Sequence, residues 1–90
     1  MKNINSKRIQ QMEQLLNEAL NPTELSIIDN SHLHAGHAGA KSGKGHFELF
    51  IVSDKFTGLT PLKRHQLVYD SLGDMMTEDI HALSIKANTN

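Results

Sequence analysis

Hydrophobic residues recur at helical spacing in the first part of the chain. Between Ile9 and Leu20 the apolar side chains repeat every three or four positions, so that they share one face of a helix. Asn5 or Ser6 offers a side-chain oxygen that can cap the start of this helix. Pro22 ends it, because proline disfavours helical geometry in the residue before it. The pattern predicts an amphipathic first helix.

Three later segments alternate apolar and polar side chains, as strands with one buried face do. They are residues 24–31, 46–54 and 80–87. In the last of them the alternation puts His81 on the same side as Leu83. These segments predict three strands.

A second amphipathic helix is predicted between the second and third strands. Thr60 provides a hydroxyl cap, and Pro61 suits the first helical position. The helical wheel puts Leu67 on the polar face, where a leucine beside cations can mark a partner contact. His65 falls on the apolar arc and is expected to be a buried, hydrogen-bonded core histidine. The whole arc, which we expect to face the core, contains Leu62, His65, Val68, Tyr69, Leu72, Met75 and Met76.

The predicted order is helix, strand, strand, helix, strand, which is an α/β (α+β) fold class with helices packed on a three-stranded mixed sheet. The first two strands pair antiparallel, and a right-handed crossover places the third parallel to the second. The starts of strands two and three then meet the connection between strands one and two at one end of the sheet. We therefore expect His81 to lie toward that connection. His46, which begins the second strand, is expected to stack or hydrogen-bond there rather than to bind a metal.

Length and composition fit one small domain, residues 1–90. We expect residues 1–5 and 88–90 to be disordered and residues 32–45 to form a long mobile loop. The formal net charge of -1 lacks the basic excess of nucleic-acid binders. No apolar run approaches the roughly 20 residues of a membrane span, and the first residues lack the apolar stretch of a secretory signal. We expect a cytoplasmic protein without membrane contact.

The chain contains no cysteine. This excludes disulfides, thiolate nucleophiles and any zinc or iron–sulfur site that depends on cysteines of this chain alone. Any metal chemistry must therefore use histidine or carboxylate side chains.

Residues 31–47, SHLHAGHAGAKSGKGHF, contain four of the six histidines and four of the six glycines. The spacing excludes a phosphate-binding loop, because the glycine-lysine pair is followed by another glycine and a strand rather than by a helix. Neutral imidazole binds zinc, copper, nickel and iron, so His32, His34 and His37 are candidate ligands. The spacing alone favours a solvated loop. The approach of His81 from a rigid strand favours a functional role.

Three segments together resemble the BolA family: SHLHAGH, HFELFIVSDKFTGLTPLKRHQLVYDSL and IHALSIKA. The resemblance covers residues 7–87. It implies a class II KH-like fold and no enzyme activity. The loop departs from the commoner family pattern, because it is glycine-rich, carries the additional His37 and lacks a proline often found there.

The first function that the resemblance implies is that of an adapter. BolA-like proteins partner monothiol glutaredoxins and share a bridging [2Fe-2S] cluster with them in iron–sulfur cluster assembly, trafficking or iron regulation. The family's cluster histidines match His81 and, in the loop, His34, and the departure in the loop leaves His32 and His37 open as the second ligand. Two histidines replace two thiolates on one iron in Rieske centres. The glutaredoxin cysteine and glutathione would supply the missing sulfurs, so we expect no cluster on the free chain. We expect the free chain to be a monomer or a weak homodimer.

The second function that the resemblance implies is that of a DNA-binding transcriptional regulator. Residues 56–72 resemble a helix-turn-helix, in which Lys63, Arg64 and His65 would approach phosphates or base edges, with Lys55 adding positive charge. The slightly negative net charge and the expected core position of His65 place this function second.

Overall fold

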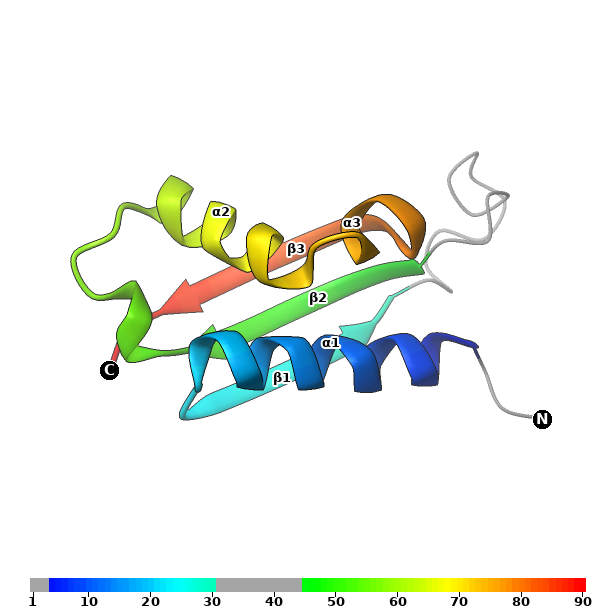
Figure 1. Ribbon diagram of the computed structural model, residues 1–90, viewed down its shortest axis with the longest axis horizontal. Helices are drawn as coiled ribbons and strands as arrows, with labels where there is room; N and C mark the ends of the chain where they lie inside the picture. The colour runs from blue at the N-terminus through cyan, green and yellow to red at the C-terminus, as the bar shows by residue number, and fades with distance from the viewer. Residues whose placement is uncertain (1–3, 31–44) are drawn as a thin grey trace.

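The computed structural model describes residues 4–30 and 45–90, so most of the loop expected at residues 32–45 lies outside the described residues. None of the helices in this described part is long and apolar enough to cross a membrane. Figure 1 shows the helices lying on one face of the sheet, which gives two layers. The elements follow in the order α1 (Ile4–Leu20), β1 (Glu24–Asp29), β2 (Gly45–Val52), the 3₁₀ turn η3 (Asp54–Phe56), α2 (Pro61–Leu72), α3 (Met75–Glu78) and β3 (Ile80–Asn88).

The three strands form one mixed sheet in the order β1-β2-β3. β1 pairs antiparallel with β2, and β3 pairs parallel with β2. The predicted fold class and strand pairing are therefore confirmed. Because β2 and β3 are parallel, both begin at the same end of the sheet (Figure 1).

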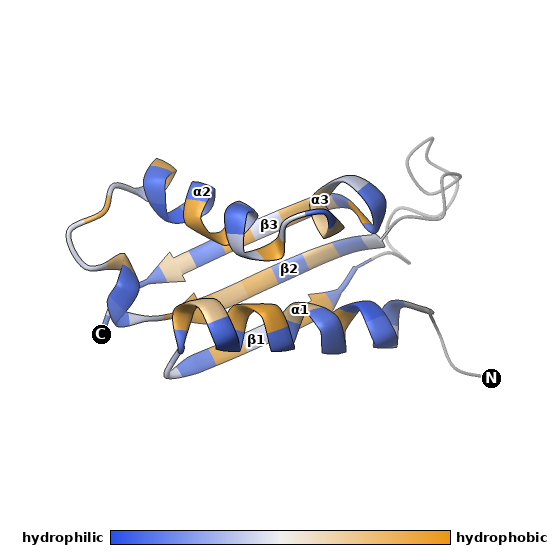
Figure 2. Cartoon of the chain, viewed as in Figure 1, coloured by the Kyte–Doolittle hydropathy of each residue, from blue (hydrophilic) through white to orange (hydrophobic). Residues whose placement is uncertain are grey.

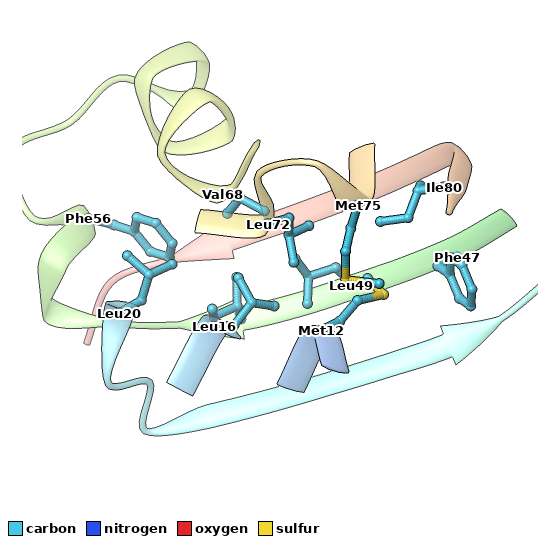
Figure 3. Close-up of a cluster of buried hydrophobic side chains, with 11 residues drawn as sticks. Met12, Leu16, Leu20, Phe47, Leu49, Phe56, Val68, Leu72, Met75 and Ile80 are labelled. Atoms are coloured by element: carbon cyan, nitrogen blue, oxygen red, sulfur yellow. The ribbon is translucent and has the colours of Figure 1, made fainter. Parts of the chain in front are cut away.

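The core lies between the sheet and the helices. Every second residue of β2 from Phe47 to Ile51 is buried, as is every fourth residue of α1 from Met12 to Leu20. Figure 2 shows apolar residues along β2, the central strand. The two periods predicted from the sequence thus meet at one interface. The buried hydrophobic side chains, most of them labelled in Figure 3, are Met12, Leu16, Leu20, Phe47, Leu49, Ile51, Phe56, Val68, Leu72, Met75 and Ile80.

The prediction of which residues of α2 face the core is wrong on one side of the helix. Leu62 and Tyr69 are exposed, by 68% and 39%, whereas Leu67 packs against the core. Arg64 lies on the same flank as Leu67 and donates a hydrogen bond of 3.0 Å to the carbonyl of Ala87 in β3. This bond joins that flank to the sheet, and periodicity alone does not reveal it.

α2 also ends before the two methionines that the wheel assigned to it. Gly73 has a φ of 56°, in the left-handed region that glycine adopts most easily, and its N–H donates to the carbonyl of Tyr69 at 2.9 Å. The helix therefore stops at Leu72. Met75 and Met76 belong to the short helix α3, where Met75 is buried.

Segments expected to be disordered or mobile take part in the fold where the structure describes them. α1 already includes Asn5, and β3 includes Asn88. The side chain of Asn90 donates to a carboxylate oxygen of Asp54 at 2.7 Å, which ties the last residue to η3. Gly45, expected to end the mobile loop, instead begins β2. Backbone pairing and side-chain hydrogen bonds extend the domain beyond the limits drawn from hydrophobic pattern.

Gly45 is tested by a change to alanine. A Cβ at this position would overlap the ring of Phe47 and approach Oδ1 of Asn5 to 3.1 Å. Because Phe47 is held in the core, we expect Gly45→Ala to lower the free energy of unfolding by about 1–3 kcal/mol, measured by urea denaturation.

The control is the same change in a Phe47→Leu background, where the smaller side chain relieves the overlap. Gly45→Ala is expected to cost at least about 0.5 kcal/mol less there, as contacting residues do in a double-mutant cycle. Equal costs in both backgrounds would show that the ring is not the obstacle.

Candidate functional site

The candidate site lies at the end of the sheet where β2 and β3 begin. The N–H of Gly45 donates to the carbonyl of Asp79, the residue before β3, at 2.9 Å. The N–H of Asn30, just after β1, donates to the carbonyl of His46 at 2.8 Å. Asn30 and Gly45, the residues on either side of positions 31–44, therefore both lie at this end, as the topology predicted.

β3 carries one extra residue here. Gly45 pairs with Ile80 while the next residue, His46, pairs with Ala82, so His81 has no partner in β2 and forms a bulge. The bulge allows Ile80 and Leu83 both to pack against the core, and His81 is left exposed. The sequence prediction that His81 simply shares the side of Leu83 is wrong for this reason.

The bulged histidine contacts a buried one. The ring centroids of His46 and His81 lie 4.9 Å apart, with an angle of 51° between the ring planes. His46 is only 6% exposed, although it precedes the core residue Phe47 and so belongs to the opposite face of β2. His46 was expected to stack or hydrogen-bond at the sheet end; it makes a ring contact there, but the planes are tilted rather than stacked.

A network of polar side chains fixes the backbone next to the bulge. Nε of Arg8 forms a salt bridge of 3.2 Å with Asp79, and Nη1 of Arg8 donates to Oδ1 of Asn5 at 2.9 Å. Nδ2 of Asn5 in turn donates to Asp29 at the end of β1, at 3.1 Å. Arg8 is 8% exposed, so its hydrogen bonds offset the cost of burying its charge.

This network was not predicted. Asn5 or Ser6 was expected to cap the first helix, but both lie inside α1, and Asn5 bonds instead to Arg8 and Asp29. Arg8 and Asp79 are separated by 71 positions, and no local spacing connects them. The signal available was spacing: Arg8 lies four positions before Met12 and eight before Leu16, which places a charge on the apolar side of the helix, where it needs a partner.

His46 and His81 offer two imidazoles at this end. Among residues 4–30 and 45–90, no group of three or more histidine, aspartate or glutamate side chains could hold a metal ion. The other predicted ligands, His32, His34 and His37, lie outside the described residues. Because His46 is buried, the described part offers one accessible imidazole at this end, that of His81, and any metal centre here needs ligands from elsewhere.

The residues predicted to contact nucleic acid lie at the other end of the sheet, after β2. Lys55 and Lys63 are exposed, and His65 is half-buried rather than a core residue. Arg64 donates to the carbonyls of Leu59 and Ala87, both at 3.0 Å, so its guanidinium is used within the domain. Where a helix-turn-helix was expected across residues 56–72, the described structure has one full helix, α2, preceded by the three-residue turn η3.

The sheet face turned away from the helices carries a shallow hollow. Ile28 and Phe50 contribute exposed apolar surface to it. It contains one acid and one base but no histidine, so it does not extend the candidate site. Its lining residues are Ser26, Ile28, Glu48, Leu49, Phe50, Ser84 and Lys86.

Similar sequences are found among characterised proteins. SufE-like protein 1, chloroplastic/mitochondrial, of Arabidopsis thaliana is 47% identical over 79 residues, which cover 82% of this chain and 21% of that protein. Protein BOLA1, chloroplastic, of the same plant is 44% identical and covers 91% of this chain and 53% of its own length. The DNA-binding transcriptional regulator BolA of Escherichia coli K12 is 35% identical, over 89% of this chain and 73% of its own.

The matched regions set limits on what these relatives imply. The chain spans about a fifth of the SufE-like protein and about half of the BolA-like proteins of Arabidopsis, cattle and mouse. The two Arabidopsis relatives are named as organellar proteins, so the cytoplasmic location expected for this chain stays a prediction.

Solved structures share the fold described above. The BolA domain of SufE1 from Arabidopsis thaliana matches with a TM-score of 0.80 and 44% identity over 91% of each chain. BolA1 from the same plant matches with a TM-score of 0.78 and 37% identity over 99% of this chain and 94% of that one. A family model described as BolA-like protein matches residues 16–90. With the fold and most of its length matched in this way, the chain belongs to the BolA family.

Proposed function

We propose that this chain is a non-enzymatic adapter that partners a monothiol glutaredoxin and shares a bridging [2Fe-2S] cluster with it. The role falls within iron–sulfur cluster assembly, trafficking or iron regulation. The observation that carries the proposal is the exposed imidazole of His81 on a rigid strand, at the sheet end where Asn30 and Gly45 lead into the histidine-rich segment.

The donor chemistry supports a shared cluster. The chain has no cysteine, and two histidines suffice for one iron of a [2Fe-2S] cluster. His81 supplies one imidazole, and a loop histidine, His34 first and His32 or His37 otherwise, supplies the second. The partner's cysteine and glutathione supply the sulfur ligands, so that the free chain carries no cluster.

The position of His81 suits a ligand shared between two proteins. Its side chain is exposed, so a second protein can approach it. The backbone before it is fixed by the buried Ile80 and by the salt bridge of Asp79, and the backbone after it by the pairing of Ala82 with His46. Because the backbone of His81 is already fixed, metal binding restricts only the remaining freedom of its side chain.

His81→Ala tests this assignment. The chain is mixed with a monothiol glutaredoxin, iron, sulfide and glutathione, and visible absorbance, visible circular dichroism and complex size are followed. We expect His81→Ala to remove the spectrum of the shared cluster. Its free energy of unfolding should stay within about 0.5 kcal/mol of the parent value, because the side chain is exposed.

The matched control is His65→Ala, which removes a histidine from α2 at a distance from the site and should leave the spectrum unchanged. Separate changes of His32, His34 and His37 to alanine identify the second ligand. A spectrum that survives His81→Ala unaltered would disprove the ligand assignment.

A second candidate function is DNA binding in transcriptional regulation. It is favoured by relatives named as DNA-binding transcriptional regulators, from Escherichia coli at 35% identity and from Vibrio cholerae at 37%. In this chain Lys55 and Lys63 are the exposed cations suited to phosphate contacts, whereas Arg64 is bonded to backbone carbonyls.

Lys55→Ala combined with Lys63→Ala tests the DNA-binding function. If both contact phosphates, DNA affinity falls and the slope of log K against log salt decreases by about 2, since each contact contributes about 0.9. The measurement is fluorescence anisotropy across a salt series, with Lys7→Ala, on α1, as the control. Absence of measurable binding by the parent chain at low salt would dispose of this function.

A further inference from the structure

We infer that His46 is a positioning residue that holds the imidazole of His81 in a restricted orientation at the end of the sheet where β2 and β3 begin. The inference rests on the proposed function in assigning His81 as the shared ligand. It adds a role for a second histidine that does not itself bind the iron.

His46 is held in place by its surroundings. It is 6% exposed, its carbonyl accepts the N–H of Asn30 at 2.8 Å, and the neighbouring Phe47 is locked in the core. Gly45 on its other side donates to the carbonyl of Asp79 at 2.9 Å. The ring of His46 is therefore a fixed surface, set by packing and by the backbone on both sides.

The side chain of His81 needs such a surface to be held in one orientation. As the extra residue of a bulge it has no partner in β2, and its side chain is exposed. Bulges redirect side chains but do not immobilise them. The described contact that limits the ring of His81 is the ring of His46, with centroids 4.9 Å apart and planes inclined at 51°.

The orientation of His81 affects how tightly it binds a metal. Residues that orient a metal-bound histidine contribute to affinity, and their loss commonly costs about 10-fold or more. If His46 acts through the shape of its ring, a planar ring without nitrogens at this position still restricts the orientation of His81. A residue of similar bulk without a planar ring does not restrict that orientation.

The experiment compares His46→Leu with His46→Phe. In the free chain, ¹H–¹³C NMR of His81 reports its ring environment and the averaging of its χ1 angle. We expect His46→Leu to shift the ring signals of His81 and to increase that averaging, while His46→Phe keeps χ1 restricted. Urea denaturation confirms that each variant is folded before it is compared.

The second measurement is cluster loading with the glutaredoxin, followed by visible circular dichroism. We expect the concentration needed for half-loading to rise about 10-fold in His46→Leu and to stay near the parent value in His46→Phe. Unchanged His81 signals in a folded His46→Leu variant would overturn the inference. A His46→Phe variant that loses the cluster while His81 keeps its restricted χ1 would also overturn it, because His46 would then act through its nitrogens.

Failure of the inference and failure of the proposed function are distinguishable. A cluster that survives His81→Ala disproves the ligand assignment, yet the NMR comparison of the free chain still decides whether His46 orients the ring of His81. A cluster lost in His81→Ala, with no effect of His46→Leu on either measurement, leaves the function standing and removes the positioning role.

Discussion

The single extra residue at the start of β3 is the constraint on which the candidate site depends. In a regular strand Ile80 and Leu83 would point to opposite faces, because side chains alternate. Both pack against the core, so one residue between them must leave the β2–β3 pairing. That residue is His81. Burial of two apolar side chains thus produces an exposed histidine at a fixed place.

The surroundings of the bulge explain why it stays in register. The carbonyl of Asp79 accepts the N–H of Gly45, and its carboxylate is held by Arg8 from α1. A slip of β3 along β2 would break the backbone bond and separate a mostly buried charge from its partner, which is costly in a low-dielectric interior. The same slip would move Ile80 out of the core. The backbone bond, the salt bridge to α1 and the burial of Ile80 therefore all favour the same register of β3 against β2.

The order of elements and the sheet topology were predictable because their signals are local. Apolar spacing located the helices and strands, Thr60 and Pro61 marked the start of α2, and the crossover rule placed β3 beside β2. The location of His81 at the sheet end followed from this topology alone. The residue-level contacts of the site did not follow.

Those contacts escaped prediction for identifiable reasons. His81 continues the alternation of Leu83 and Ile85 in the sequence, so the bulge is invisible in the pattern unless Ile80 is also required to be buried. The bond from Arg64 to the carbonyl of Ala87, which links α2 to the sheet, joins residues 23 positions apart. Polar contacts between residues far apart in the sequence do not alter the hydrophobic periodicity, so the pattern cannot reveal them.

The two candidate functions use opposite ends of the domain. His81 stands where the parallel strands begin, whereas Lys55 and Lys63 follow the point where β2 ends. The eight residues of β2 separate the two ends by roughly 25 Å, at about 3.3 Å per residue. A glutaredoxin bound around His81 therefore need not cover the lysines, and a nucleic acid bound at the lysines need not reach the histidines. Substitutions at one end are expected to leave the other end intact, so the two candidate functions can be tested separately in a single chain.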